Sequence, residues 1–354
     1  MLASLGSEAR GAADATGSAP NTWVELHRRD SGDWHRQQHA GIAYDSRRGH
    51  LLVFGSDTHG SDWDNSLHVF DPATPGWSRR GESIAPDRYR VGEDGIPVAG
   101  DGDPWPWAMH TFDTVVYDPM RDALLVAAVP LHNPARKGFD VDMEHPTWVH
   151  DLQTGTWSTL PSPVNFFAGS AAYDHARDTI VAYRYGIWEL GPERKAWVRA
   201  LPGSHHGIHH SMVYDRRRGE LLIFGDHGDS RDIWVYTPGK HAGAAGSWDK
   251  RDPGGDDCPA DQHFPVDYSE DDDLFVLVPD EHREGQPGRA VTCIYDPRSN
   301  TYHRLDGADL PAQGMNYMMV YDSKGKRFLL VSGSHTKPTT VHALRLDLQR
   351  LGIR

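Results

Sequence analysis

Apolar residues occur along the chain in paired short runs, with a charged turn between the two runs of each pair. The first run ends in tyrosine and the second is strongly apolar, as in GIAYDSRRGHLLVFG and SMVYDRRRGELLIFG. Short apolar runs separated by turn residues predict β-strands that are joined as hairpins. Six such pairs are present, and their tyrosines are Tyr44, Tyr117, Tyr173, Tyr214, Tyr268 and Tyr321.

The spacing of these pairs predicts the architecture. Successive tyrosine numbers differ by 73, 56, 41, 54 and 53 residues, which is near the kelch period of about 50 residues. Most pairs are followed by a turn rich in Pro, Gly or Thr and by a strand that starts at an aromatic residue. These aromatic residues are Trp77, Trp157, Trp197, Trp248 and Tyr302. The pattern predicts an all-β propeller of about six four-stranded blades, and residues 84–107 leave room for a seventh.

The two ends of the repeat region complement each other. The sixth copy lacks its outer strand, and the segment NTWVELHRR around Trp23 is a strand without a copy of its own. We expect this N-terminal strand to complete the last blade, because pairing the two leaves no open sheet edge. Residues 21–350 thus resemble the kelch propeller family, although the paired glycines of that family are reduced here to Gly55 and Gly225.

We expect residues 21–354 to form a single propeller domain. Residues 1–20 are rich in Ala, Gly and Ser, which indicates a disordered leader or translation from an upstream start codon. No signal peptide is visible in them, so the sequence leaves the compartment open. We expect a monomer.

Net charge and missing motifs remove several classes of function. A formal charge of −14 disfavours binding to nucleic acid or to an anionic membrane surface. No apolar run is long enough to cross a membrane. The GxSxG, Walker and Rossmann motifs are all absent, so we expect neither serine hydrolase chemistry nor an organic cofactor.

The 22 histidines point to a candidate site, because several occupy equivalent positions of the repeat. Five positions before the repeated tyrosines stand His39, Phe112, Ala168, His209, His263 and Asn316, and His110 lies two residues before Phe112. The ends of the second strands add His59, His132, His227 and His335, with Tyr183, Arg184 and Tyr185 in the third copy. Arg199 closes an outer strand. Because these junctions share one end of a propeller, we expect one mouth rich in His, Tyr and Arg.

This placement resembles the propeller-shaped ulvan lyases, in which two His of one blade act with a Tyr and an Arg of the next. The matching residues are His110, His132, Tyr183 or Tyr185, and Arg199. The resemblance implies β-elimination on an anionic, uronate-containing polysaccharide. His110 or His132 would act as base or carboxylate partner, Tyr183 as acid or as acid and base, and Arg199 as carboxylate clamp.

We expect substrate contacts from Trp105, Trp107, His39, His59, Arg184 and Tyr185. Ordinary packing of these aromatic residues and a solvated strand end for Arg199 are the alternatives. An extracellular or periplasmic location would follow only from the lyase resemblance, and the identity of the sugar does not carry over.

A second group of side chains is suited to a metal. His209, His227, Cys258 and His263 could bind structural Zn²⁺, and the resembled lyases carry a metal of this His/Cys kind. Because Cys258 and Cys293 are the only cysteines, a single disulfide between them is an alternative, as is a free cysteine.

Two further functions compete with the lyase interpretation. Propellers serve widely as non-catalytic binding modules, and fold alone does not determine function. A metal-dependent propeller enzyme could also use the histidines near the axis for isomerisation or oxidation.

Overall fold

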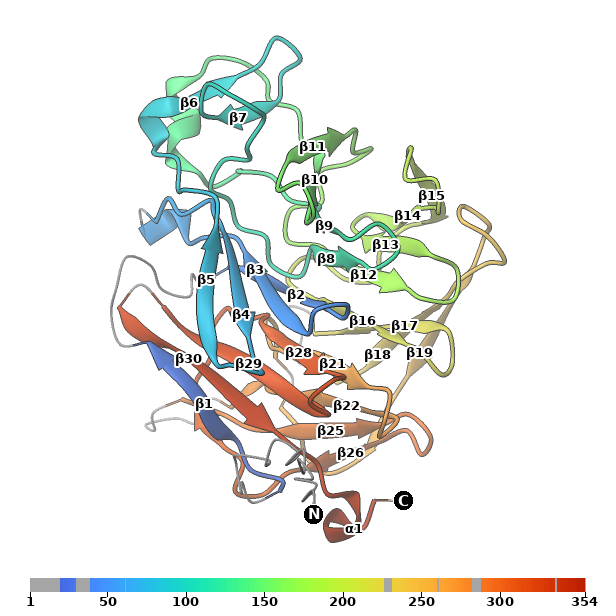
Figure 1. Ribbon diagram of the computed structural model, residues 1–354. Helices are drawn as coiled ribbons and strands as arrows, with labels where there is room; N and C mark the ends of the chain where they lie inside the picture. Colours follow the sequence, from blue (N-terminus) through green and yellow to red (C-terminus); the bar gives the residue numbers. More distant parts are fainter. Residues whose placement is uncertain are drawn as a thin grey trace, which may run out of the picture.

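The computed structural model describes residues 20–29, 39–60, 62–225, 231–259, 261–281, 288–334 and 336–353. The leader expected over residues 1–20 lies outside these ranges except for its last residue. The described chain is all-β and forms mainly four-stranded antiparallel sheets (Figure 1). Within the described ranges, no helix has the length and apolar character needed to span a membrane.

Six larger sheets follow one another along the chain, and we number them in chain order. Sheet 1 contains β2 (Gly41–Asp45), β3 (His50–Phe54), β4 (Leu67–Asp71) and β5 (Gly76–Arg80). Sheet 2 contains β8 (Val115–Asp118), β9 (Ala123–Val126), β10 (Thr147–Asp151) and β11 (Trp157–Leu160). Sheet 3 contains β12 (Ser170–Asp174), β13 (Thr179–Tyr183), β14 (Gly186–Leu190) and β15 (Trp197–Pro202).

The remaining three large sheets continue this order. Sheet 4 contains β16 (Ser211–Asp215), β17 (Glu220–Phe224), β18 (Ile233–Thr237) and β19 (Ser247–Arg251). Sheet 5 contains β21 (Val266–Ser269), β22 (Leu274–Leu277), β25 (Cys293–Asp296) and β26 (Thr301–Arg304), with β20 (Gly254–Gly255) added in parallel. Sheet 6 contains β28 (Met319–Asp322), β29 (Arg327–Ser334), β30 (Lys337–Leu344) and β1 (Val24–Arg29).

Short elements decorate these sheets. Two small sheets are formed by β6 (Tyr89–Val91) with β7 (Pro97–Ala99), and by β23 (Asp280–Glu281), β24 (Arg289–Ala290) and β27 (Leu310–Pro311). The helical turns are η1 (Thr58–Gly60), η2 (Pro86–Arg88), η3 (Pro134–Gly138) and α1 (Leu348–Leu351). Residues 84–107 therefore hold a two-stranded hairpin, and the described chain contains no seventh four-stranded sheet.

The charged turn of the repeat has a local cause. Asp45, which follows the repeated tyrosine, accepts hydrogen bonds from the backbone N–H groups of Arg47 and Arg48. The turn then ends at Gly49 with a φ of 81°, a left-handed conformation that glycine adopts without steric cost. The same pair of aspartate bonds forms at Asp118, Asp174 and Asp215. These bonds select the turn that joins the first two strands of a sheet.

The first strands of the six sheets contact one another in a closed cycle. β2 contacts β8, and contacts continue through β12, β16, β21 and β28 back to β2. All six strands line a central cavity of about 180 Å³. In Figure 1 these inner strands lie toward the middle of the molecule, whereas outer strands such as β5, β11, β15 and β26 lie toward its margin.

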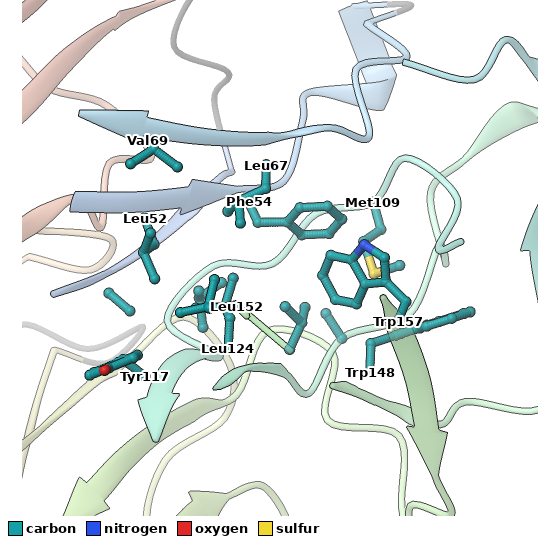
Figure 2. Packing of buried hydrophobic residues seen from close by; sticks show 14 of the residues in the cluster. Leu52, Phe54, Leu67, Val69, Met109, Tyr117, Leu124, Trp148, Leu152 and Trp157 are labelled. Atoms are coloured by element: carbon teal, nitrogen blue, oxygen red, sulfur yellow. The ribbon is translucent and has the colours of Figure 1, made fainter. Parts of the chain in front are cut away.

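One apolar cluster lies between each pair of successive sheets. Figure 2 shows the cluster between sheets 1 and 2, where Phe54 faces Trp157 with ring centroids 5.1 Å apart. Corresponding clusters join sheets 2 and 3, 3 and 4, 4 and 5, and 5 and 6. A further cluster joins sheet 6 back to sheet 1, with Val331 and Phe70 among its buried residues. Every large sheet therefore buries both of its faces.

The N-terminal strand completes the last sheet, as the sequence predicts. β1 pairs antiparallel with β30, with Val24 opposite Ala343 and Arg29 opposite Thr339. Asn21 adds two hydrogen bonds to Asp347, near the end of the chain. Because these bonds join residues more than 300 positions apart, they tie the two ends of the described chain together.

Arginines of the hairpin turns bridge neighbouring sheets. Arg48 of sheet 1 donates to Asp45 at 2.7 Å and to both carboxylate oxygens of Asp122 in sheet 2, at 2.7 and 2.6 Å. Asp122 is almost completely buried. The hydrogen bonds from Arg48 lower the pKa of Asp122 to about 2. Arg121 and Arg218 make equivalent bridges to the turns of the next sheets.

We predict that Arg48→Met lowers the free energy of unfolding at pH 7 by about 2 kcal/mol, because it leaves the Asp122 carboxylate buried without its main partner. Because the pKa of Asp122 is lower in the folded than in the unfolded chain, its ionised carboxylate stabilises the fold above the unfolded pKa near 4. This stabilisation is lost as the pH falls from there toward 2. The difference in the free energy of unfolding between variant and wild type should therefore become smaller as the pH falls from about 4 toward 2. Denaturant unfolding at several pH values measures it. Arg79→Met, at an exposed residue of β5, serves as the matched control and should leave stability unchanged.

Candidate functional site

A residue just before five of the six inner strands has an unusual backbone conformation. His39, Phe112, Ala168, His209 and His263 all have φ values between 48° and 66°. Non-glycine residues rarely adopt this left-handed region, and each instance costs about 1 to 3 kcal/mol. The same strain at five equivalent positions shows that the repeat imposes it, and the five residues lie at one end of the inner strands.

Four histidines meet at this end, between sheets 1 and 2. The rings of His39 and His110 are stacked, with centroids 4.2 Å apart and an interplanar angle of 6°. His59 lies 4.7 Å from His110, and His132 lies 4.9 Å from His59 and 5.6 Å from His110. We call these four residues the histidine cluster. It contains the predicted pair His110 and His132 together with the predicted substrate contacts His39 and His59.

The histidine cluster is buried at one side and open at the other. His39 and His110 are buried, whereas His59 and His132 are exposed. The hydroxyl of Thr58 lies 3.1 Å from Nε2 of His110 and donates to the carbonyl of His132. Oδ1 of Asp57 lies 3.5 Å from Nδ1 of His39 and 4.0 Å from Nε2 of His110.

The imidazole of His110, at the core of this site, is uncharged at neutral pH. Burial lowers the pKa of His110 to about 2, and the neighbouring His39, His59 and His132 add to the effect, against a smaller opposing influence of Asp57. Burial and the charges of His59 and His39 also lower the pKa of His132. A neutral imidazole offers a lone pair, which can accept a proton or bind a metal ion.

The structure places Tyr183 differently from the sequence-based expectation. Its side chain is fully buried, and its hydroxyl accepts hydrogen bonds from the backbone N–H groups of His205 and His206, at 2.7 and 3.1 Å. Its ring lies 4.7 Å from His210 and 5.3 Å from Trp248, toward sheet 4, whereas His110 faces sheet 1. Tyr183 as placed here is therefore not open to a substrate, because the loop after β15 covers it.

An exposed phenol and two guanidinium groups lie at the adjacent turn. Tyr185 is 54% exposed, with a φ of 56°. Its hydroxyl accepts a 2.8 Å hydrogen bond from Arg184, whose guanidinium carbon lies 4.1 Å from the centre of the tyrosine ring. Arg199 donates to the carbonyl oxygen of Tyr185 and lies over Trp188. We call Arg184, Tyr185 and Arg199 the tyrosine–arginine group.

A short segment connects this group to the histidine cluster. The ring of Phe167 lies 5.0 Å from His132 and 6.4 Å from His110. Gly169, two residues later, packs against the side chain of Arg184 so closely that a Cβ atom would contact it. Residues 167–169 therefore pack against both groups.

The two predicted sugar-stacking tryptophans are packing residues in this structure. Trp107 is fully buried, stacks on Tyr89 and donates to the carbonyl of Val98. Trp105 donates to the carbonyl of Asn65, and its ring lies against Trp157. The alternative of hydrophobic packing therefore applies to both, since they anchor the β6–β7 hairpin to sheets 1 and 2.

The predicted His/Cys metal site is not formed as expected. Cys258 is joined to Cys293 by a disulfide, so its sulfur is not a thiolate ligand. His209 and His263 do lie together, with rings 4.2 Å apart and Nδ1 atoms 3.2 and 2.8 Å from the hydroxyl of Tyr317. The fourth predicted ligand, His227, lies outside the described residues, as does His335.

Three residues that the sequence did not point to, Asp57, Thr58 and Phe167, contact the histidine cluster directly. The available signal was the position of Asp57 and Thr58 immediately before His59 in the loop that follows the second strand. Phe167 lies next to Ala168, one of the positions equivalent to His39.

No family model matches this chain, and no curated protein matches it. Its function must therefore be inferred from the side chains themselves.

We predict that the disulfide closes a loop of 35 residues in the purified protein. Thiol titration of the denatured, unreduced chain should then detect no free thiol. Cys258→Ser and Cys293→Ser should each lower the free energy of unfolding by about 3 to 4 kcal/mol. The double variant should be no less stable than either single one, because both changes remove the same bond. Two titratable thiols together with one bound zinc ion would contradict this assignment and restore the His/Cys site.

Proposed function

We propose that the six large sheets are the blades of a single kelch-like propeller, closed by the N-terminal strand. Three findings support this proposal: the cycle of inner strands, the apolar cluster between sheets 6 and 1, and the pairing of β1 with β30. In such a ring the loops before the inner strands share one mouth with the loops after the second strands.

At this mouth, we propose, the protein is a polysaccharide lyase that cleaves a uronate-containing glycan by β-elimination. The observation that carries the proposal is that residues 167–169 pack against both the exposed imidazole of His132 and the half-buried side chain of Arg184. Arg184 in turn donates to the exposed phenol of Tyr185, and the exposed Arg199 donates to the carbonyl of Tyr185. Elimination next to a carboxylate needs a base, an acid and a cation that neutralises the carboxylate, and these three kinds of side chain can supply them.

Each residue has a role in the proposed reaction. A guanidinium group of Arg184 or Arg199 neutralises the uronate carboxylate and so acidifies the adjacent C5–H bond. The imidazole of His132 takes the C5 proton, the electron pair forms the C4–C5 double bond, and the C4–O bond breaks. The hydroxyl of Tyr185 donates a proton to the leaving oxygen. Tyr185 thus takes the role that the sequence assigned to Tyr183, because Tyr183 is buried.

The distribution of charge is compatible with an anionic substrate despite the net charge of −14. The acidic residues 270–273 lie in the turn between β21 and β22, at the end of the inner strands opposite to the histidine cluster. The two guanidinium groups of the tyrosine–arginine group lie at the mouth. An anionic polymer would therefore meet these two guanidinium groups at the mouth, away from the acidic turn.

We predict that His132→Gln lowers kcat by at least about 100-fold, which is typical of losing a general base. The melting temperature should stay unchanged because His132 is exposed. Formation of the unsaturated uronate is followed by its ultraviolet absorbance on a panel of uronic-acid polymers. His241→Gln, at an exposed loop histidine, is the control and should retain full activity. If wild-type protein produces no unsaturated product on any polymer but binds one of them, the propeller is a binding module.

Two conservative tyrosine variants separate the two candidate acids. Tyr185→Phe should lower kcat by about 100-fold without loss of stability. Tyr183→Phe should instead lower the melting temperature, because it removes the hydroxyl that accepts hydrogen bonds from the N–H groups of His205 and His206. Loss of turnover in Tyr183→Phe at unchanged stability, with a fully active Tyr185→Phe, would reverse the assignment.

A further inference from the structure

Three ligand atoms converge at the buried side of the histidine cluster. A nitrogen of His39, a nitrogen of His110 and a carboxylate oxygen of Asp57 all lie within 4.8 Å of one another. Two ligands that each lie about 2.1 Å from a tetrahedral metal ion are about 3.4 Å apart. The observed separations of 3.5 Å from His39 to Asp57 and 4.0 Å from His110 to Asp57 are close to that value. Because the rings of His39 and His110 are stacked with an interplanar angle of 6°, one ring has to rotate before both nitrogens can direct their lone pairs at one ion.

One of these atoms lacks a hydrogen-bond partner within the described structure. Nδ1 of His39 is completely buried, and the carboxylate of Asp57 lies beyond hydrogen-bond distance from it. A buried polar nitrogen without a partner costs about 1 to 3 kcal/mol. A bound metal ion would supply the missing interaction.

The backbone holds the three ligands in place before any metal binds. The carbonyl of His39 accepts hydrogen bonds from the N–H groups of Thr111 and Phe112, both at 2.9 Å. The N–H of Ser56, next to Asp57, donates to the carbonyl of Met109, next to His110. These bonds tie together the three segments that carry the ligands. The left-handed φ of 64° at His39 is therefore maintained by its surroundings, as is common at functional sites.

The ligand set indicates which ions fit. Two imidazole nitrogens and one carboxylate oxygen suit first-row divalent transition metals such as Zn²⁺, whereas Ca²⁺ and Mg²⁺ prefer oxygen ligands alone. Two His and one carboxylate also leave coordination positions open, as in catalytic rather than structural sites. The exposed rings of His59 and His132 lie nearby, 5.7 Å from His39 and 5.6 Å from His110, respectively.

We propose that His39 Nδ1, His110 Nε2 and the carboxylate of Asp57 bind a divalent first-row transition metal ion at the mouth of the propeller. Binding replaces the hydrogen bond between Thr58 and Nε2 of His110. This site is distinct from the His/Cys group between sheets 4 and 5 that the sequence suggested. A role for the ion in holding the uronate carboxylate rests on the proposed function, but binding of the ion does not.

Metal binding is tested first on the wild-type protein after treatment with a chelator and dialysis. Calorimetric titration with Zn²⁺ should give one site per chain, and Zn²⁺ should raise the melting temperature. Co²⁺ should give weak visible absorption typical of nitrogen and oxygen ligands. An intense near-ultraviolet band from a sulfur ligand, or the absence of any binding, would overturn the proposal.

Variants locate the site. Asp57→Asn and His39→Gln should each weaken Zn²⁺ binding at least tenfold, whereas Thr58→Val should bind as tightly as wild type or more tightly, because it removes only the competing hydroxyl. His209→Gln, at the other pair of adjacent histidines, should bind Zn²⁺ normally. Weakened binding in His209→Gln together with normal binding in Asp57→Asn would refute the site. The Co²⁺ spectrum of the wild type tests the ligand set even if one variant fails to fold.

Turnover is measured separately, so that the two proposals fail independently. Stoichiometric Zn²⁺ binding that depends on Asp57, without elimination on any uronic-acid polymer, would keep the metal site and reject the lyase. Elimination by chelator-treated protein that binds no Zn²⁺ would keep the lyase and reject the metal site.

Discussion

Every large sheet of this protein is apolar on both faces, and this constraint determines the rest of the structure. In β3, Leu52 and Phe54 face sheet 2, whereas Leu51 and Val53 face sheet 6. Because side chains alternate along a strand, the second strand of each sheet must be covered from both sides. A row of sheets would leave two apolar faces in water. Only a closed cycle covers all of them, and the cluster between sheets 6 and 1 together with the pairing of β1 and β30 completes that cycle.

The same cycle creates the candidate site. His39 and His110 are 71 residues apart in sequence, yet their rings are stacked because the starts of consecutive inner strands are neighbours. The left-handed conformation repeated before the inner strands adds to this convergence. The free energy gained by burying apolar surface between the sheets offsets the cost of this backbone conformation. Strained and partly unsatisfied groups can therefore persist at this end. The opposite end carries the arginine and aspartate bridges, which join neighbouring sheets.

Burial divides the site into two parts with different capacities. His39, His110 and Asp57 are held in a low-dielectric interior, where an uncharged imidazole is a good metal ligand but has little use as a proton carrier. His59, His132 and Tyr185 are exposed to solvent, so the proposed polymeric substrate can contact them. The two proposals use different parts of this arrangement. Elimination needs the exposed groups beside a guanidinium, and metal binding needs the buried ones.

The sequence alone was sufficient to predict the structural features that repeat along the chain. Periodic apolar runs predicted the six sheets, and the orphan strand around Trp23 predicted the joining of the chain ends, since hairpin patterns and unpaired edges are local properties. Equivalent positions in the repeat also identified His39, His59, His110 and His132 as neighbours. The sequence could not show that Tyr183 and Trp107 are buried, that Cys258 is bonded to Cys293, or that Asp57 lies between two histidines. Those facts depend on loops that differ from one sheet to the next, and only the packed tertiary structure decides how such loops cover or expose a side chain.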